Sequence, residues 1–564
     1  MATFLLLSAS SPSPVSPDTT KIPSTNHRWS LAQELNFIPN PSKQSNYFNG
    51  HLSHADELSM KHKAKLREAR DVLNKVEDPF EGLMMTDALQ RLSIGHHFQE
   101  EISHVLHSQY LDYLNTTSFP DHDLYEVSTR FRLLRQQGYN MPADVFYNFT
   151  DKERQFKSTL CKDIRGLRGL YEASQLSMEG EDILDEASVF SAKVLNGWLN
   201  HLDEEQSSLV RTTLMHPYHK SPARVMSKNV VLSGWPWAAL LQDLSKLDFD
   251  MVKATSQQEV LQVSKWWKET GLAQELKSAR DQPLKWYMWA LEALTDPSLS
   301  EQRMELTKPI SFVYLIDDIF DVYGTLEELT LFTQTVKRWE IDGIEQLPDY
   351  MKSCFRSLYE VTNQIAEKAH QEHGWNPIHT LRKSWGSLCD AFLVEAKWFA
   401  SGRLPSAQDY LENGIISSGI PLVLVHLFFL LGQGFTDQTV HLLNHRPPRL
   451  VTSAAAILRL WDDLGSAKDE EQEGHDGSYV QCYMKEHKGC STESARNEVI
   501  RLISQSWKQI NRECLNPKFP ATFTKASLNF ARMSSLMYSY DDNHSLPILE
   551  DYLNSMHYGD SLSN

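Results

Sequence analysis

The sequence predicts an all-α protein made of two helical domains. From about residue 55 onward, apolar side chains recur at intervals of three and four, as they do on one face of a helix. Alternating runs of Val, Ile and Thr, which indicate strands, are scarce. With 564 residues, of which 41% are hydrophobic, the chain is long enough to bury more than one core.

The first thirty residues differ in composition from the rest. They read MATFLLLSASSPSPVSPDTTKIPSTNHRWS, which is rich in Ser, Thr and Pro, with Asp18 as the only acidic residue. Such a segment is typical of a disordered tail or of a plastid transit peptide, and its composition does not decide between them. We expect residues 1–30 to lie outside the folded domains of a protein of the plastid or the cytosol.

The next part of the chain, residues 31–245, is predicted to form an N-terminal helical domain. The segment 66–95 has the helical period and ends on a glycine, and the segment 179–202 has the same period. Side chains that suggest chemistry gather only after about residue 275. This asymmetry predicts that residues 31–245 are ancillary and that residues 246–564 form the catalytic domain.

Charge and composition exclude several classes of function. The net charge of −18 argues against binding to nucleic acid or to an anionic membrane, because both require basic patches. The longest apolar run, IPLVLVHLFFLLG (420–432), is too short to cross a bilayer and is predicted to be a buried core helix. Six cysteines without paired spacing favour a reducing compartment over a disulfide framework.

A first acidic cluster ends the apolar segment SFVYLIDDIFDVYG (311–324). On a helix, Asp317 and Asp321 are four residues apart and share a face, with Asp318 beside them. Carboxylates that face a buried environment need a positive charge nearby. Mg²⁺ favours one or two carboxylates combined with phosphate oxygens, so the cluster indicates a magnesium site, although a solvated acidic surface gives the same pattern.

A second acidic cluster lies in LRLWDDLGSAKDE (458–470). Asp462, Ser466 and Glu470 are spaced at four-residue intervals and follow one stripe of a helix. A hydroxyl between two carboxylates is a suitable ligand set for Mg²⁺. Two such stripes that face each other can hold several cations between them.

Basic and aromatic residues near these clusters suggest an anionic, otherwise apolar ligand. Arg280, Arg459 and Lys397 are candidate partners for a phosphate group, for which the guanidinium fork is well suited. Aromatic rings can stabilise a carbocation by about 0.5–2 kcal/mol each. The candidates are Trp286, Tyr287, Trp289, Tyr314, Trp398 and Tyr538.

These motifs resemble those of plant class I terpene synthases, and the resemblance covers nearly the whole chain after the first thirty residues. DDIFD (317–321) matches the family's DDxxD motif, and DDLGSAKDE (462–470) matches its (N/D)DxxSxxxE motif. The intervals from Arg280 to Asp317 and from Asp317 to Asp462 fit as well. Further landmarks are LYEASQLSMEGEDILDEA (170–187), EAKW (395–398) and YLENG (410–414).

The resemblance implies a class I terpene synthase fold for the C-terminal domain and a relic α-barrel for the N-terminal domain. It implies a prenyl diphosphate substrate and three Mg²⁺ ions, with Mn²⁺ as an alternative. It also implies roles for individual side chains. Asp318 would support the metal ligands, Arg280 and Arg459 would bind the diphosphate, and Trp289 and Tyr538 would line the substrate pocket. The metal ligands would be Asp317, Asp321, Asp462, Ser466 and Glu470, with Glu395 close by.

The sequence departs from the family pattern at two places. The RDR motif reads Arg280-Asp281-Gln282, and the tandem arginines of the RRx8W motif are absent near Trp29. In lacking the tandem arginines, the sequence resembles the subgroup of linalool and nerolidol synthases. No DxDD motif is present, so chemistry that starts by protonation is not expected.

The expected reaction is metal-triggered ionisation of geranyl or farnesyl diphosphate, followed by addition of water at C3 to give linalool or nerolidol. Ser417 and Ser418, at a predicted helix break before Pro421, are candidates to orient the water, although the break alone also explains them. The alternatives are a synthase of olefins or cyclic terpenes and, less expected, a prenyl chain-elongating transferase. We expect a monomer without a nucleic-acid partner or a membrane span.

Overall fold

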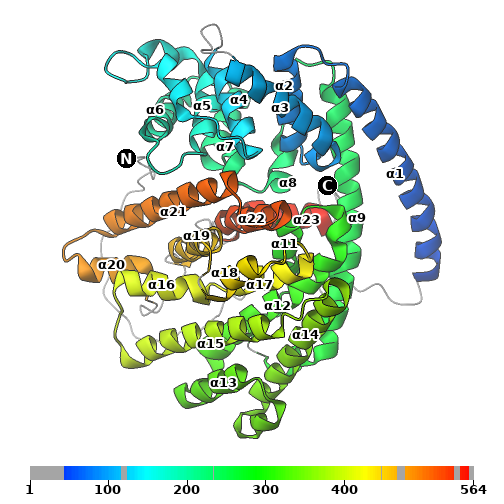
Figure 1. The fold of residues 1–564 in the computed structure, drawn as a ribbon, viewed down its shortest axis with the longest axis vertical. Helices are drawn as coiled ribbons and strands as arrows, with labels where there is room; N and C mark the ends of the chain where they lie inside the picture. Colours follow the sequence, from blue (N-terminus) through cyan, green and yellow to red (C-terminus); the bar gives the residue numbers. More distant parts are fainter. Residues whose placement is uncertain are drawn as a thin grey trace, which may run out of the picture.

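The computed structural model describes residues 44–115, 123–232, 234–277, 279–445, 447–466, 477–538 and 546–557. Within these ranges the chain forms α helices joined by short 3₁₀ turns and loops, and one isolated antiparallel bridge joins Thr150 to Phe156. The predicted all-α fold with two helical domains is confirmed (Figure 1).

The N-terminal helices surround a core of their own, in the upper part of Figure 1. Four of them begin at an aspartate whose carboxylate accepts a backbone N–H of the first turn, which fixes where each helix starts: Asp78, Asp123, Asp163 and Asp203. The helices are α1 (Gln44–Leu73), α2 (Pro79–Arg91), α3 (Gln99–Asn115), α4 (Leu124–Gln136), α5 (Ile164–Ser174), α6 (Asp182–Trp198), α7 (Glu204–Met215) and α8 (Ala223–Met226).

A single long helix, α9 (Ala238–Thr270), connects the two halves of the molecule. Near its start, Leu241 and Leu244 belong to the N-terminal core, whereas Val263 and Trp267 near its end belong to the C-terminal core. Helix α1 runs beside α9 along one edge of the protein (Figure 1). The domain division expected between residues 245 and 246 stays a prediction, and it falls inside this continuous helix.

The C-terminal helices form a larger bundle below, with its own core. They are α10 (Leu272–Glu275), α11 (Pro283–Ala293), α12 (Ser300–Asp318), α13 (Leu326–Arg338), α14 (Asp349–His373), α15 (Ile378–Ser401), α16 (Ala407–Ser417), α17 (Ile420–Leu431), α18 (Asp437–His445), α19 (Arg449–Ser466), α20 (Tyr479–Glu486), α21 (Thr492–Leu515), α22 (Ala521–Met537) and α23 (Pro547–His557).

Helix α17 lies in the middle of this bundle. Every residue of the helix except Pro421 is buried, and it packs against α12, α14, α15, α16, α19 and α22. The stretch Ala407–Leu431 is apolar and long enough to cross a membrane, but 78% of its most apolar window is buried inside the protein. The prediction of a buried core helix at 420–432 is therefore confirmed.

Helix α21 fastens the C-terminal bundle to the N-terminal one. The side-chain amide of Asn511 donates to the backbone oxygens of Gln175 at 3.1 Å and Ser177 at 2.9 Å. Its Oδ1 lies 2.8 Å from Nε2 of His219. Because all three contacts are buried, they fix the relative position of the two bundles.

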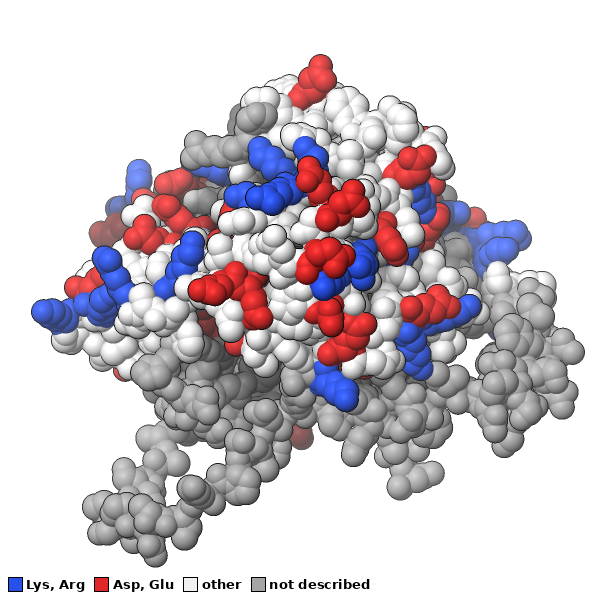
Figure 2. Space-filling model, turned by 90° about the horizontal axis from the view of Figure 1, so that it is seen from below, with Lys and Arg blue, Asp and Glu red and all other residues white. Residues whose placement is uncertain are grey.

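The face shown in Figure 2 carries acidic and basic side chains mixed together. Among the residues drawn there, neither sign of charge dominates. The six cysteines are free thiols.

A buried ion pair anchors α12, the helix that carries the first acidic cluster. Nη2 and Nε of Arg303 donate to the carboxylate of Glu259 on α9 at 2.6 Å and 2.9 Å, and the Tyr287 hydroxyl donates to it at 2.7 Å. The side chains of Arg303 and Glu259 are only 3% and 2% exposed. Removing the carboxylate would leave a guanidinium buried without its counter-charge.

We predict that Glu259→Ala lowers the free energy of unfolding by about 3–5 kcal/mol, the typical cost of breaking a buried ion pair. Glu301→Ala is the matched control, because Glu301 pairs with Lys368 at the surface with 62% of its side chain exposed. The control should cost less than about 1 kcal/mol. Urea unfolding followed by circular dichroism measures both, and equal losses would contradict the prediction.

Candidate active site

The first acidic cluster lies where α12 ends. The α helix stops at Asp318 and continues as a π-helical turn over Ile319–Tyr323, which contains Asp321. Asp318 is buried, Asp317 is partly buried and Asp321 is exposed. The expected α-helical turn between Asp317 and Asp321 is a π-helical turn, in which residues four apart still lie on roughly the same side, so their shared face stays a prediction. Such π turns are frequent at functional sites.

Arg280 neutralises this cluster. Its Nε donates to Asp318 at 2.8 Å, its backbone N–H donates to the same carboxylate at 2.7 Å, and its Nη2 donates to Asp317. The guanidinium also lies 4.9 Å from the centre of the Tyr314 ring. Burial lowers the pKa of Arg280, but the two carboxylates outweigh that effect, so the pKa is raised and the side chain stays charged.

The second cluster is built around Arg459 on α19. Its Nη2 donates to the Ser417 hydroxyl at 2.9 Å, and that hydroxyl donates to Oε1 of Glu395 at 2.6 Å. The amide of Asn413 donates to the same carboxylate oxygen at 3.1 Å. Nη1 of Arg459 lies 3.6 Å from the carboxylate of Asp462. Helices α15, α16 and α19 thus each contribute to one polar network.

The two clusters are close enough to influence each other electrostatically. Burial raises the pKa of Glu395, Arg459 opposes the rise, and Asp317 of the first cluster adds to it. The pKa of Tyr314 is raised to about 12, first by burial, with further contributions from Asp462 and Asp317. Because charges act over short distances between partly buried groups, these couplings indicate that both clusters surround one site.

The helix break before α17 is set by close packing. Gly419 has a φ of +74°, and a Cβ built on it would come within 2.5 Å of Val313 on α12. The Ser418 hydroxyl donates to the Ile415 carbonyl at 2.8 Å and accepts the N–H of Ile420 at 3.3 Å. Of the two serines expected at the break, Ser417 therefore joins the polar network, while Ser418 caps the broken helix.

The aromatic candidates divide into two groups. Nε1 of Trp289 donates to the hydroxyl of Tyr314 at 2.9 Å, and the ring of Tyr314 lies beside Arg280. Tyr287 is buried, and its hydroxyl donates a hydrogen bond to Glu259. The expectation that its ring stabilises a cation in the pocket is therefore not supported.

The remaining candidates lie as follows. Trp286 is buried in the core against Trp267, with ring centres 4.9 Å apart. Trp398 and Tyr538 are partly buried and pack against the C-terminal core. Lys397 is exposed. Ser466 is the last residue of α19, and its side chain and the whole of Glu470 lie outside the described residues.

Three residues of the site were not identified from the sequence. Asn413 lies one helical turn before Ser417 and contacts Glu395, so the helical spacing could have suggested it. Lys285 is partly buried in the first turn of α11, and its pKa is lowered to about 8 by burial and by Arg280, while Asp462 opposes the shift. Asp463 is buried, and it accepts the Tyr410 hydroxyl at 2.7 Å.

Asp463 fixes the orientation of the second cluster. Its other oxygen accepts the backbone N–H of Tyr479, at the start of α20, at 3.0 Å. These two bonds tie α19 to α16 and to α20. Burial raises the pKa of Asp463 to about 7, with Arg459 opposing. Asp463 therefore points into the protein, whereas its neighbour Asp462 points towards Arg459.

The donor set suits Mg²⁺. The candidate ligands Asp317, Asp321, Asp462 and Glu395 all offer carboxylate oxygens, which hard divalent cations prefer. The arginines beside them supply positive charge in the ligand-free arrangement. Nε of Arg459 is buried and has no hydrogen-bond partner among the residues that the structure describes. An orphan donor of this kind fits an anionic ligand in the same site.

Two family models match the chain. The model of the terpene synthase N-terminal domain matches residues 36–214, and the model of the terpene synthase metal binding domain matches residues 268–509. The chain belongs to the terpene synthase family, and it carries that family's metal binding domain.

Curated plant relatives match over most of their length. A probable terpene synthase of Ricinus communis is 54% identical over 87% of each chain. An (E)-nerolidol synthase of Cannabis sativa is 49% identical over 93% of this chain and 96% of its own. A chloroplastic S-(+)-linalool synthase of Arabidopsis thaliana is 46% identical over 92% of this chain and 90% of its own. Tricyclene synthases of Antirrhinum majus are 45% and 46% identical over 94% of this chain and 93% of theirs, so the family alone does not fix the product.

Solved structures share the fold. An isoprene synthase from grey poplar leaves (Populus x canescens), in complex with three Mg²⁺ ions and dimethylallyl-S-thiolodiphosphate, has a TM-score of 0.83 at 33% identity, over 91% of this chain and 98% of its own. A limonene synthase with 2-fluorolinalyl diphosphate has a TM-score of 0.84 at 34% identity, over 89% of this chain and 94% of its own.

We predict that Ser417→Ala lowers kcat/KM for a prenyl diphosphate about ten- to a hundredfold, because it removes a hydroxyl hydrogen-bonded to two charged groups. Ser418→Ala, its neighbour at the helix break, should change kcat/KM less than about threefold because its bonds only cap a helix. Steady-state kinetics with matched circular dichroism spectra tests the pair. Indistinguishable kinetics would contradict the separation of their roles.

Proposed function

We propose that this terpene synthase makes an acyclic tertiary alcohol, nerolidol from farnesyl diphosphate or linalool from geranyl diphosphate. The enzyme ionises the substrate to an allylic cation that shares its charge between C1 and C3. Water then adds at C3 and loses a proton to give the alcohol. The sequence identity of 49% with a nerolidol synthase and of 46% with a linalool synthase supports this product class.

The observation that carries the proposal is the residue at position 282. Where the family pattern has a second arginine, Gln282 is neutral, and its Oε1 is buried without a hydrogen-bond partner among the described residues. With one cation fewer, the released diphosphate is held less firmly beside the allylic cation. Ring closure first requires the cation to reach a cisoid form, and early capture by water avoids that step.

The acidic residues hold the metal ions in this proposal. Three Mg²⁺ ions, for which Mn²⁺ is an alternative, would be held by oxygens of Asp317, Asp321, Glu395, Asp462, Ser466 and Glu470. Bound there, Mg²⁺ supplies Lewis-acid charge that offsets the negative charge developing on the departing diphosphate. Asp318 keeps Arg280 in place through two hydrogen bonds.

The two arginines bind the diphosphate. Arg280 lies against Asp317, and Arg459 has a buried Nε with no partner in the part of the chain that the structure describes. Each guanidinium can donate to a phosphate oxygen while keeping part of its present contacts, because it has five N–H groups. Trp289 and Tyr538 line the apolar end of the pocket, where Trp289 is held by its bond to Tyr314.

We propose that the enzyme acts as a monomer in the plastid or the cytosol. The chloroplastic linalool synthase of Arabidopsis thaliana supports the plastid. Plastids supply mainly the ten-carbon diphosphate and the cytosol mainly the fifteen-carbon one. Location and product are therefore linked, with linalool expected in the plastid and nerolidol in the cytosol.

Incubation of the purified enzyme with each diphosphate tests the product. We expect Mg²⁺-dependent formation of linalool or nerolidol by gas chromatography, with ¹⁸O in the alcohol when the reaction runs in H₂¹⁸O. Isopentenyl diphosphate is left out, so a chain-elongating transferase gives no product. A hydrocarbon or a cyclic terpene as the main product would contradict the proposal and indicate another type of terpene synthase.

A second prediction concerns Gln282. Gln282→Arg restores the second cation, so we expect a larger share of cyclic products from the same substrate. Gln274→Arg is the matched control, because Gln274 is exposed on α10 and adds the same charge outside the site. Product profiles of both variants are compared by gas chromatography. If Gln282→Arg leaves the profile unchanged, the missing arginine is not what keeps the product acyclic.

A further inference from the structure

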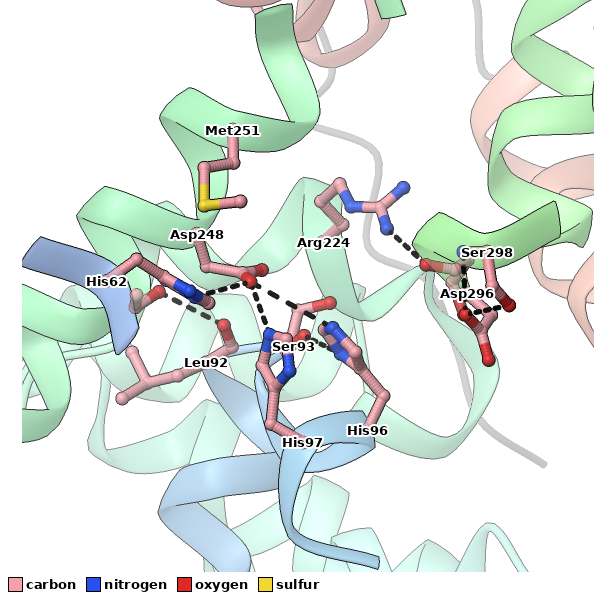
Figure 3. Close-up of polar contacts among 12 residues, drawn as sticks. His62, Leu92, Ser93, His96, His97, Arg224, Asp248, Met251, Asp296 and Ser298 are labelled. Atoms are coloured by element: carbon pink, nitrogen blue, oxygen red, sulfur yellow. Dashed lines mark hydrogen bonds and ion pairs between the residues drawn. The ribbon is translucent and has the colours of Figure 1, made fainter. Parts of the chain in front are cut away.

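A second cluster of metal-ligating side chains lies far from the acidic site, between the N-terminal helices and α9 (Figure 3). Its residues come from three separate elements. His62 lies on α1, His96 and His97 form a short 3₁₀ turn (Gly95–Phe98), and Asp248 lies on α9. In Figure 3 the three imidazoles surround the Asp248 carboxylate.

Three imidazole nitrogens converge on one carboxylate oxygen. Nε2 of His97 lies 2.6 Å from Oδ1 of Asp248, Nε2 of His62 lies 3.2 Å from it, and Nε2 of His96 lies 3.9 Å from it. In a tetrahedral zinc site with bonds of about 2.0 Å, neighbouring ligand atoms are about 3.3 Å apart. The ligand atoms of His62, His97 and Asp248 all lie within 4.8 Å of one another, so these three residues fit around one ion, whereas His96 lies farther out and has to move inward to join them.

His96 offers an unused lone pair. Its Nδ1 lies 3.2 Å from the backbone oxygen of Ser93, which can only accept, so Nδ1 carries the hydrogen and Nε2 the lone pair in the neutral ring. Nε2 is buried and has no hydrogen-bond partner among the residues that the structure describes.

This arrangement is characteristic of a metal ligand. A metal-binding histidine usually donates its second ring N–H to a backbone carbonyl, which fixes the tautomer and aims the other nitrogen at the ion. A lone pair aimed at a carboxylate oxygen without a hydrogen between them is unfavourable. A cation between His96 and Asp248 removes that conflict, whereas a hydrogen bond from His96 Nε2 would require the other tautomer or a charged ring.

The charged groups around the cluster have other partners. Arg224 lies nearby, but its Nη2 donates to the Thr295 carbonyl at 2.9 Å and its Nη1 lies 3.4 Å from Glu292. The buried carboxylate of Asp248 therefore faces mainly imidazoles.

We propose that His62, His97 and Asp248 form a structural site for Zn²⁺ or a similar divalent transition metal, which His96 completes by moving towards the ion. Three imidazoles and one carboxylate give four protein ligands, the number of a closed structural zinc site. Imidazole nitrogen selects zinc-like ions, whereas the all-oxygen ligands near Asp317 suit Mg²⁺. The two sites therefore take different metals.

The ion fastens α1 and the 3₁₀ turn to α9. Asp248 and Trp267 lie on the same α helix, roughly 28 Å apart along its axis at 1.5 Å per residue. Trp267 donates to Asp281, the residue after Arg280, at 2.8 Å. The zinc site thus stabilises the helix that supports the Arg280 loop, and it takes no part in the chemistry.

Metal analysis of the full chain, purified without a histidine tag and kept in excess Mg²⁺, tests the proposal. We expect one zinc per chain, and visible absorption of four-coordinate Co²⁺ when cobalt replaces it. His97→Ala and Asp248→Asn should each lower the zinc affinity about tenfold or more. His104→Ala is the matched control, because His104 is an exposed histidine on α3, and it should bind zinc like the wild type.

Thermal unfolding separates a metal from a proton as the occupant. After removal of bound metal with a chelator, added Zn²⁺ should raise the unfolding temperature of the wild type and of His104→Ala but not of His97→Ala, since an ion that binds only the folded state stabilises it. The proposal is overturned if the wild type binds no zinc beyond the level of His97→Ala. The proposal is also overturned if the unfolding temperature of the protein changes when the pH is lowered but not when zinc is added.

Discussion

The balance of charge between two acidic clusters and two arginines governs the site. Arg280 holds Asp317 and Asp318, and Arg459 lies between Glu395 and Asp462. Carboxylates this close and partly buried repel one another unless cations accompany them. In the ligand-free protein the arginines provide that charge. We infer that Mg²⁺ takes over this role when it binds, which would make the arginines more available to an anionic substrate and couple metal binding to diphosphate binding.

The surrounding fold holds the two clusters at a fixed separation. Helix α17 fills the centre of the bundle, and Gly419 allows α12 to approach the break before it. The buried Arg303–Glu259 pair ties α12 to α9, which in turn reaches the N-terminal core. The proposed zinc site acts on the other end of α9. The N-terminal helices thus pack against the C-terminal bundle through α9, and the described acidic residues of the candidate active site all lie in the C-terminal bundle.

Local patterns predicted the helices, the two acidic clusters and both arginines, because each of these is written in a short stretch of sequence. The π turn that contains Asp321 was missed because an i, i+4 spacing does not reveal a local insertion in a helix. The structural role of Asp463 was not predicted, because it depends on the packing of Tyr410 from another helix. The histidine cluster depends on contacts of Asp248 with His97 and His62, which are separated from it by 151 and 186 positions in the sequence. No local pattern records contacts over such separations.

Calorimetric titration of the protein with inorganic diphosphate, with and without Mg²⁺, tests the central coupling directly. If the arginines are held by the carboxylates until a divalent cation replaces them, diphosphate should bind tightly only in the presence of Mg²⁺. Removing the metal with EDTA should abolish the binding. Equal affinity in both conditions would show that the arginines bind diphosphate independently of the acidic clusters and would contradict this account.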